Sequence, residues 1–124
     1  MATSFDGVRV GLESRIERVI DDSLLTGHVG GAGLFATPSM IMLMEQAAHA
    51  AVEPSLPGGH TTVGYEVCVR HLAPANGGEA VVVMARLDEV TGNRLHFTVE
   101  CSKDGGDTLV GSGTHKRAII PTLA

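Results

Sequence analysis

The clearest pattern in the chain is an almost uninterrupted apolar segment from Pro38 to about Val52. Thr37 followed by Pro38 is typical of a helix start, with Thr as the N-cap and Pro at the first helical position. Pro54 and the turn residues 57–59 mark the other end. The pattern predicts a helix from Pro38 to about Val52. Because it is apolar on nearly every face, other elements must cover it.

After this segment, apolar and polar residues alternate with the period of a β-strand. Four strands are predicted: Thr61–His71, Ala80–Val90, Arg94–Cys101 and Thr108–Ile120. In the first strand, the alternation places four apolar side chains on one face: Val63, Tyr65, Val67 and Val69. In the last strand, Gly111 and Gly113 share a face and leave room for the close approach of a helix or a ligand.

The part of the chain before the helix is harder to interpret. Between Gly7 and Ile20 the apolar spacing fits either a strand or a helix. Thr26–Gly33 reads TGHVGGAG, and its glycines favour a flexible loop. No clear strand precedes this loop and it lacks the GxGxxG pattern, so we interpret it as a flexible cover and not as a phosphate-binding loop.

Together these elements predict an α+β protein in which a curved antiparallel sheet wraps around one long central helix. This arrangement is called the hotdog fold. Residues 1–124 show no repeat or composition shift, so a single domain is expected. A lone sheet of this kind keeps exposed edges and leaves one helix face partly uncovered. We therefore expect a homodimer.

Composition narrows the possible partners. A formal net charge of -5 and an aromatic content of 3% argue against a nucleic-acid partner. No segment approaches the roughly 20 apolar residues of a membrane span, so no membrane partner is expected. The first ten residues lack a signal-peptide pattern, which predicts a cytoplasmic location. Cys68 and Cys101 are interpreted as small buried hydrophobic residues.

A metal site and a bound cofactor are not expected. The six histidines are scattered along the chain, and neither HExxH nor CxxC occurs. Ser112 lies in an alternating strand and lacks the GxSxG pattern, which makes it a poor nucleophile.

Three polar residues on the predicted helix and first strand are candidates for chemistry, and each has a structural alternative. Thr37 alone could be an N-cap, worth about 1 kcal/mol. Glu45 could belong to a solvated stripe with His49 and Glu53, but its apolar neighbours suit a carboxylate to base chemistry. The alternation places His71 on the same face of the strand as the apolar side chains, so its ring should point toward the helix. The structural alternative is a histidine that is simply buried in the core.

Three segments carry a resemblance to a known family: GLFATPSMIMLMEQAA, GYEVCVRHLAPANGGEAV and GSGTHKRAII, at residues 33–48, 64–81 and 111–120. The chain resembles the fluoroacetyl-CoA thioesterase-like hotdog proteins from about Gly33 to Ile120. The resemblance implies a catalytic set of Thr37, Glu45 and His71. It also implies two substrate-binding residues, Gly64 and Arg117.

One departure from the family concerns the segment before the helix. It is rich in glycine and offers only Phe35 as an aromatic side chain for substrate binding, so we do not predict a preference for fluorinated acyl groups. The expected function is hydrolysis of a short-chain acyl-CoA to the free acid and CoA. The alternatives are a non-catalytic module that binds acyl thioesters and, less favoured, an enoyl-thioester hydratase.

Helix geometry adds a constraint on the catalytic set. Glu45 follows Thr37 by eight residues, which corresponds to about 12 Å along a helix. The two side chains therefore cannot hydrogen-bond within one subunit. Either His71 bridges them, or the partner subunit supplies one member of the set.

Overall fold

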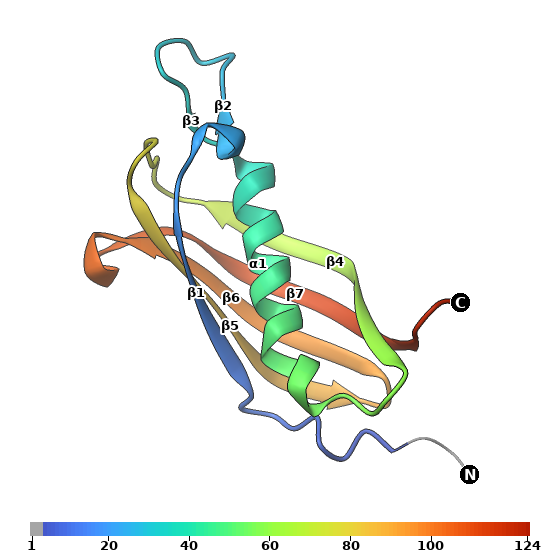
Figure 1. Cartoon of the computed structure of the whole chain (residues 1–124). Coiled ribbons are helices and arrows are strands. Elements are labelled where there is room, and N and C mark those ends of the chain that lie inside the picture. The colour runs from blue at the N-terminus through green and yellow to red at the C-terminus, as the bar shows by residue number, and fades with distance from the viewer. Residues whose placement is uncertain (1–3) are drawn as a thin grey trace.

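The fold consists of one long helix that lies against a five-stranded antiparallel sheet (Figure 1). The structure is a computed structural model that describes residues 4–124, so residues 1–3 of the predicted domain lie outside it. The helical elements are α1 (Thr37–Val52) and the short 3₁₀ turns η1 (Asp22–Leu24), η2 (Glu53–Ser55) and η3 (Asp104–Gly106). The sheet strands are β1 (Glu13–Val19), β4 (His60–His71), β5 (Ala80–Thr91), β6 (Arg94–Lys103) and β7 (Thr108–Pro121).

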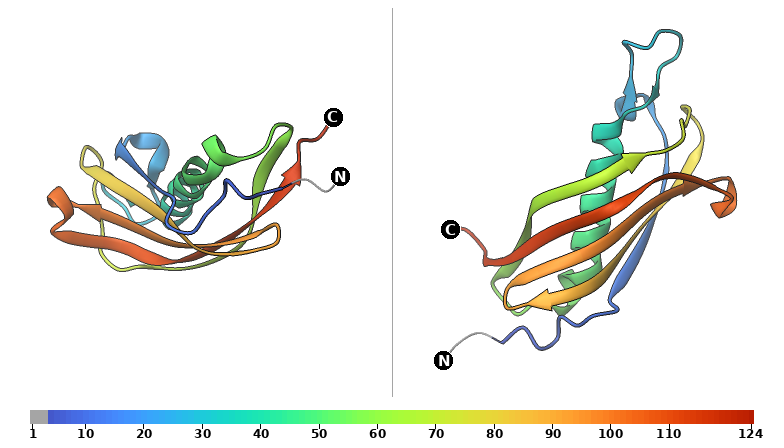
Figure 2. Two further views of the ribbon diagram at one scale, coloured as in Figure 1. Left: turned by 90° about the horizontal axis from the view of Figure 1, so that it is seen from below. Right: turned by 180° about the vertical axis from the view of Figure 1, so that it is seen from behind.

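The strand order is β1-β5-β6-β7-β4, so β4 forms one edge of the sheet and β1 the other. Every neighbouring pair is antiparallel. The sheet curves around α1, as the view from below shows (Figure 2). The predicted fold class is therefore confirmed, as are the helix and the four predicted strands to within a few residues.

The segment whose pattern was ambiguous, residues 7–20, contains β1 in its second half, and β1 pairs with β5. Between β1 and α1, the two-residue strands β2 (Leu25–Thr26) and β3 (Leu34–Phe35) form a small hairpin. Residues 27–33 form the loop of this hairpin, which extends beyond the first turn of α1 (Figure 1). The predicted loop is therefore present, and it lies above the helix start.

The predicted N-cap is wrong. Ala36 occupies the N-cap position and makes no side-chain capping hydrogen bond, whereas Thr37 is the first helical residue and Pro38 the second. The Thr37 hydroxyl instead bonds to a histidine of β4. A side chain in this position does not fold back over the helix start as a cap does.

The predicted single apolar face of β4 is also wrong, because the strand contains a β-bulge. The register of β4 against β7 shifts between Gly64 and Glu66, so Tyr65 is an extra residue. An extra residue reverses which side chains face the helix. Thr62 is therefore buried, whereas Val63 is 43% exposed and Tyr65 44% exposed.

After the bulge, odd-numbered side chains face the helix, as predicted for Val69 and His71. Even-numbered side chains in this half of β4 point away from the helix, so the prediction that both cysteines are buried is wrong for one of them. Cys68 lies in this half of β4 and is exposed, whereas Cys101 of β6 is buried as predicted.

The core lies between one face of α1 and the inner face of the sheet. The buried helix residues are Met40, Leu43, Met44, Ala47, Ala48, Ala51 and Val52. Gly111 lets the helix approach β7, because a Cβ at this position would lie 2.4 Å from the Met40 sulfur. At Gly113 the close neighbour is the backbone of β4 and not the helix.

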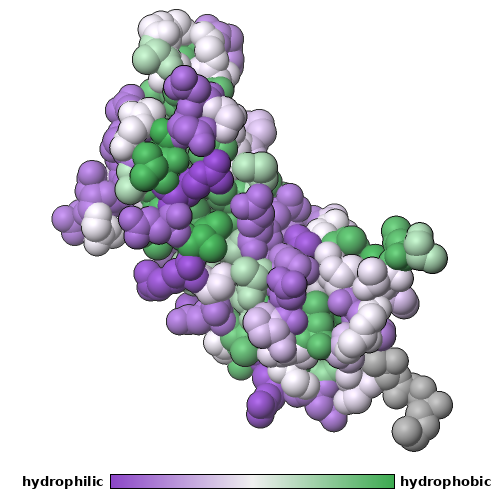
Figure 3. All heavy atoms as spheres, viewed as in Figure 1, coloured by the Kyte–Doolittle hydropathy of each residue, from purple (hydrophilic) through white to green (hydrophobic). Residues whose placement is uncertain are grey.

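The opposite face of α1 is uncovered. Met42, Gln46 and Ala50 are exposed there, and hydrophobic and hydrophilic residues are intermixed over this side of the molecule (Figure 3). Within residues 4–124, the structure contains no helix that is both long and apolar enough to cross a membrane.

Candidate active site

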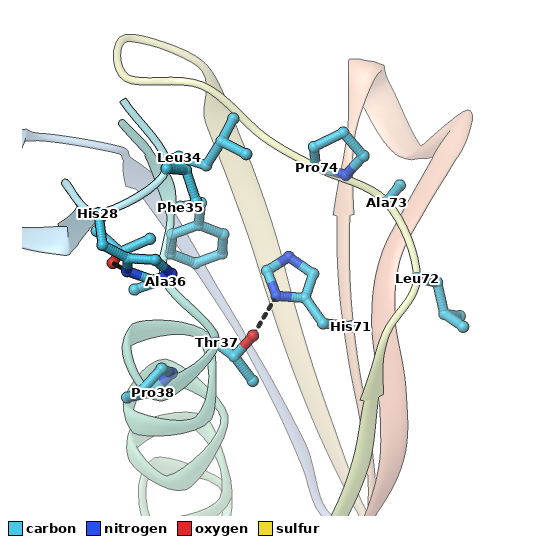
Figure 4. A pocket seen from close by; sticks show the side chains of 12 residues that line it. His28, Leu34, Phe35, Ala36, Thr37, Pro38, His71, Leu72, Ala73 and Pro74 are labelled. Atoms are coloured by element: carbon cyan, nitrogen blue, oxygen red, sulfur yellow. Dashed lines mark hydrogen bonds between the residues drawn. The ribbon is translucent and has the colours of Figure 1, made fainter. Parts of the chain in front are cut away.

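The start of α1 and the end of β4 bring together two of the predicted catalytic residues. The Thr37 hydroxyl oxygen lies 2.8 Å from Nδ1 of His71, at hydrogen-bond distance (Figure 4). The His71 ring points toward the helix, as its strand parity predicted. Phe35 packs edge-on against this ring, with 6.0 Å between the ring centroids. The pair is thus held by one hydrogen bond and one aromatic contact.

The other ring nitrogen of His71 remains available. Nε2 is shielded from solvent and has no hydrogen-bond partner among residues 4–124. A buried polar atom without a partner costs free energy, so such atoms are rare and often have a role in binding or chemistry. A proton donor or acceptor on a bound molecule would satisfy this nitrogen.

The pair borders a cavity of about 600 Å³. The hairpin, the helix start and the segment after β4 line it: Thr26, His28, Val29, Leu34, Phe35, Ala36, Thr37, Pro38, His71, Leu72, Ala73 and Pro74. Most of these side chains are apolar, and the volume lies within the range of small-molecule sites. Phe35 is buried at this cavity, where its edge-on contact fixes the His71 ring.

Glu45 does not lie in this cavity. It lines a second cavity of about 590 Å³ between the uncovered face of α1 and β4, together with Gly64 and Arg117. Its side chain is 42% exposed, and Oε1 lies 4.0 Å from Nε2 of His115. The apolar surroundings predicted for this carboxylate are present only in part, because His115 and Arg117 lie near it while Met42, Ala50 and Val63 line the same cavity. Within one subunit, the predicted catalytic set is divided between two cavities.

Gly64 makes room for the Glu45 carboxylate. A Cβ at this position would lie 2.6 Å from Oε1 of Glu45 and 2.9 Å from Cε1 of His115. Real Cβ atoms do not approach other heavy atoms so closely. The bulge at Tyr65 keeps Gly64 on the helix side of β4. Any other residue at this position would displace the carboxylate.

Arg117 is 8% exposed and reaches from β7 to β4. Its Nε donates to the Thr62 hydroxyl at 2.9 Å and its Nη2 to the Thr62 carbonyl at 3.0 Å. Its Nη1 donates to Nε2 of His115 at 3.2 Å. Burial lowers the pKa of the guanidinium, and attraction to Glu45 opposes this. The ordinary pKa of arginine is so high that the group remains a cation.

His115 is 1% exposed and is held as a neutral ring. Burial lowers its pKa the most; the hydrogen bond to the Glu66 carbonyl raises it, Arg117 lowers it and Glu45 raises it. Since Arg117 can only donate, Nε2 of His115 must accept. Nδ1 then carries the proton and donates to the Glu66 carbonyl oxygen at 2.8 Å.

Sequence reasoning missed Thr62 and His115. The alternation of the last strand contained a signal, because His115 lies two residues before Arg117 and shares its face. The stripe proposed for His49 and Glu53 is present in part: the two side chains lie 3.5 Å apart. His49 also reaches β4, where its Nδ1 lies 2.8 Å from the Thr62 hydroxyl.

Neither cavity resembles a metal site. Within residues 4–124, no three histidine, cysteine or acidic side chains are grouped so that they could hold a metal ion.

The sequence profile of a family described as fluoroacetyl-CoA-specific thioesterase matches residues 17–122 of the chain. The chain belongs to this family. A fluoroacetyl-CoA thioesterase from Streptantibioticus cattleyicolor is 37% identical to it over 123 residues, which cover 93% of this chain and 87% of the relative.

Solved structures of similar proteins share the fold. A variant of a fluoroacetyl-CoA-specific thioesterase, solved in complex with fluoroacetate and CoA, has a TM-score of 0.81. It is 34% identical, and the match covers 91% of this chain and 95% of that one. A hotdog-like protein from Thermanaerovibrio acidaminovorans has a TM-score of 0.83 and 26% identity, with 94% and 87% of the two chains covered. The fold of this family member is therefore the hotdog fold.

Proposed function

We propose that this protein hydrolyses the thioester of a short-chain acyl-CoA to the free acid and CoA. The observation that carries the proposal is the Thr37–His71 hydrogen bond at the edge of a largely apolar cavity, in a member of a thioesterase family. The cavity can take an acyl chain, and the pair supplies a group that can transfer a proton. The free Nε2 of His71 is the atom that would serve the substrate.

The proposed reaction requires a carboxylate, an imidazole and water. Glu45 either attacks the carbonyl carbon itself, which gives an anhydride that water then cleaves to the free acid and Glu45, or removes a proton from the water that attacks the thioester. The C–S bond then breaks, and His71 donates a proton to the departing thiolate. Thr37 holds the His71 ring in position. Backbone N–H groups at Gly64 or at the start of α1 would stabilise the negative charge on the carbonyl oxygen.

A homodimer would bring Thr37, Glu45 and His71 together at one site. β4 is an edge strand, and in residues 4–124 no strand pairs with its outer side. If two copies pair through this edge about a twofold axis, the strands run antiparallel. The His71 end of one β4 then lies beside the half of the partner's β4 that contains Gly64. Glu45 of one subunit would thereby approach the Thr37–His71 pair of the other.

Features of the edge support this interface. Val63 and Tyr65 on β4 and Met42 on the uncovered face of α1 are large apolar side chains exposed in the single subunit. An exposed strand edge next to apolar side chains is a site for association, since its backbone groups can pair with those of another chain. Gly64, Arg117 and Phe35 are the proposed substrate contacts: the first two in the Glu45 cavity and the third in the Thr37–His71 cavity.

The first experiment identifies the reaction. The purified protein is incubated with a panel of short-chain acyl-CoAs and enoyl-CoAs, while released thiol and enoyl absorbance are recorded together. A thioesterase releases thiol from saturated acyl-CoAs. Loss of enoyl absorbance without thiol release would indicate a hydratase, and binding without change in either signal would indicate a non-catalytic acyl-thioester module.

The second experiment tests the shared site. Glu45→Gln and His71→Ala variants should each lose orders of magnitude in kcat while remaining folded. If each site uses Glu45 from one subunit and His71 from the other, mixing the two inactive variants creates heterodimers with one intact site. Random association then restores about a quarter of the wild-type rate per subunit. No recovery after subunit exchange would rule out the shared site.

A further inference from the structure

Thr62 is a buried polar residue that the proposed reaction does not use. It lies on β4 before the bulge, is 5% exposed and faces α1. Two of its atoms contact Arg117: the hydroxyl accepts from Nε at 2.9 Å and the carbonyl accepts from Nη2 at 3.0 Å. Two parallel hydrogen bonds from one guanidinium to one residue fix its plane as well as its position.

The direction of each hydrogen bond follows from the chemistry of arginine, which can only donate. The Thr62 hydroxyl accepts from Arg117 and therefore keeps its own hydrogen for a different acceptor. Nδ1 of His49 lies 2.8 Å away and can accept it. Thr62 thus connects a cation on β7 to a side chain of α1.

The held guanidinium and the Glu45 carboxylate both border Gly64, and the two attract each other through their charges without a direct hydrogen bond. Oε1 of Glu45 and Nη1 of Arg117 lie 2.6 Å and 3.2 Å from the position that a Cβ of Gly64 would occupy. The same Nη1 donates to His115, whose Nε2 lies 4.0 Å from Oε1 of Glu45. A buried cation in a fixed position stabilises a neighbouring carboxylate much more than a mobile one in water.

We propose that Thr62 is a positioning residue, which acts through Arg117 to keep the guanidinium beside the Glu45 carboxylate. Its hydroxyl and carbonyl hold one side of the guanidinium, and His115 holds the other. The Arg117 guanidinium thereby donates at least three hydrogen bonds to other groups of the protein. Its role is in part to orient Glu45, in addition to the substrate contact proposed for it. This inference rests on the proposed function.

The test compares three threonine variants. Thr62→Val removes the hydroxyl at nearly constant volume, and Thr62→Ser keeps it. Thr61→Val is the matched control, because the neighbouring side chain points to the other face of β4. We expect Thr62→Val to lower kcat by about tenfold or more while KM stays within about twofold. Arg117 keeps its hydrogen bonds to the Thr62 carbonyl and to His115, so it remains at its proposed substrate contact, but its orientation toward Glu45 is less firmly held. Thr62→Ser should recover most of this loss.

The comparison of kcat with KM, together with recovery in Thr62→Ser, separates positioning from a merely structural role. All rates are measured at a temperature where circular dichroism shows that each variant is folded. A lower Tm alone would then leave kcat unchanged.

The outcomes distinguish this inference from the function on which it rests. If the wild type releases no thiol from any acyl-CoA, the proposed function fails and the role of Thr62 fails with it. If the wild type is active and Thr62→Val matches Thr61→Val in kcat, only the positioning role is overturned. A rise in KM with an unchanged kcat would likewise overturn it.

Discussion

A single methyl group at Gly64 should impair the proposed reaction by displacing the Glu45 carboxylate. In Gly64→Ala the new Cβ would lie 2.6 Å from Oε1 of Glu45. Ordinary contact begins at about 3.4 Å, so the carboxylate must retreat by about 0.8 Å. The backbone of Gly64 does not need the left-handed region that favours glycine, so alanine adds no backbone strain there. The perturbation is therefore confined to the neighbouring side chains.

The expected loss follows from this displacement. Misplacement of a catalytic group by 1 Å can cost about 100-fold in rate, so we expect kcat to fall by about 10- to 100-fold. Glu45 is half-exposed at the end of a flexible side chain and can move at little cost. His115 is fixed by two hydrogen bonds and must also give way, because the new Cβ would lie 2.9 Å from its Cε1. Overpacking of this kind costs about 1–3 kcal/mol.

The assay measures kcat and KM from thiol release, and Tm from thermal unfolding. Gly58→Ala is the matched control, because its Cβ would meet no atom within 4 Å and its backbone is equally unstrained. A Gly64→Ala enzyme with the kcat of Gly58→Ala would refute the assignment of Glu45 to the reaction. If KM rises and kcat is unchanged, Gly64 makes room for the substrate and not for the carboxylate.

Three further predictions concern the helix start, the buried histidine and the core. Thr37→Ala should lower kcat at least tenfold, because His71 loses its hydrogen bond. The Tm should stay nearly unchanged, because Thr37 is not the N-cap. Thr37→Ser should retain activity. Because the pKa of His115 is lowered in the folded protein, the folded protein binds fewer protons than the unfolded chain once the pH falls below about 6.5. The free energy of unfolding should therefore decrease from pH 7 toward pH 5, by at most about 1.4 kcal/mol per pH unit. His115→Gln should flatten this dependence in denaturant titrations; an unchanged slope would contradict the assignment. Gly111→Ala should lower stability by about 1–3 kcal/mol, since its Cβ would overlap Met40; an unchanged Tm would show that the helix can shift.

The main elements of the fold could be predicted because their signals are local. The apolar segment 38–52 has a length and flanking prolines that suit only a helix. Strict alternation over residues 94–101 suits only a half-buried strand, and that strand is part of β6. The ambiguous segment 7–20 lacked such a signal, because β1 lies at a sheet edge where few side chains are buried.

The candidate site could be predicted only in part, because it depends on contacts between distant elements. Strand parity correctly placed the His71 ring toward the helix. Parity failed for Tyr65, since an alternating pattern does not reveal an inserted residue. The surroundings of Glu45 were predicted from its helix neighbours, whereas its polar contacts come from β4 and β7. Thr62 was missed for the same reason: its partners lie 13 and 55 residues away.

The bulge at Tyr65 makes the length of β4 matter more than the identity of most residues in it. Removal of one residue between Gly64 and His71 would restore uniform alternation, and one half of the strand would then present the wrong side chains to the helix. No substitution elsewhere can repair such a change of phase. We therefore expect β4 to tolerate substitutions at most positions but not the deletion of a residue. We expect alignments of this family to contain many substitutions here and no gap.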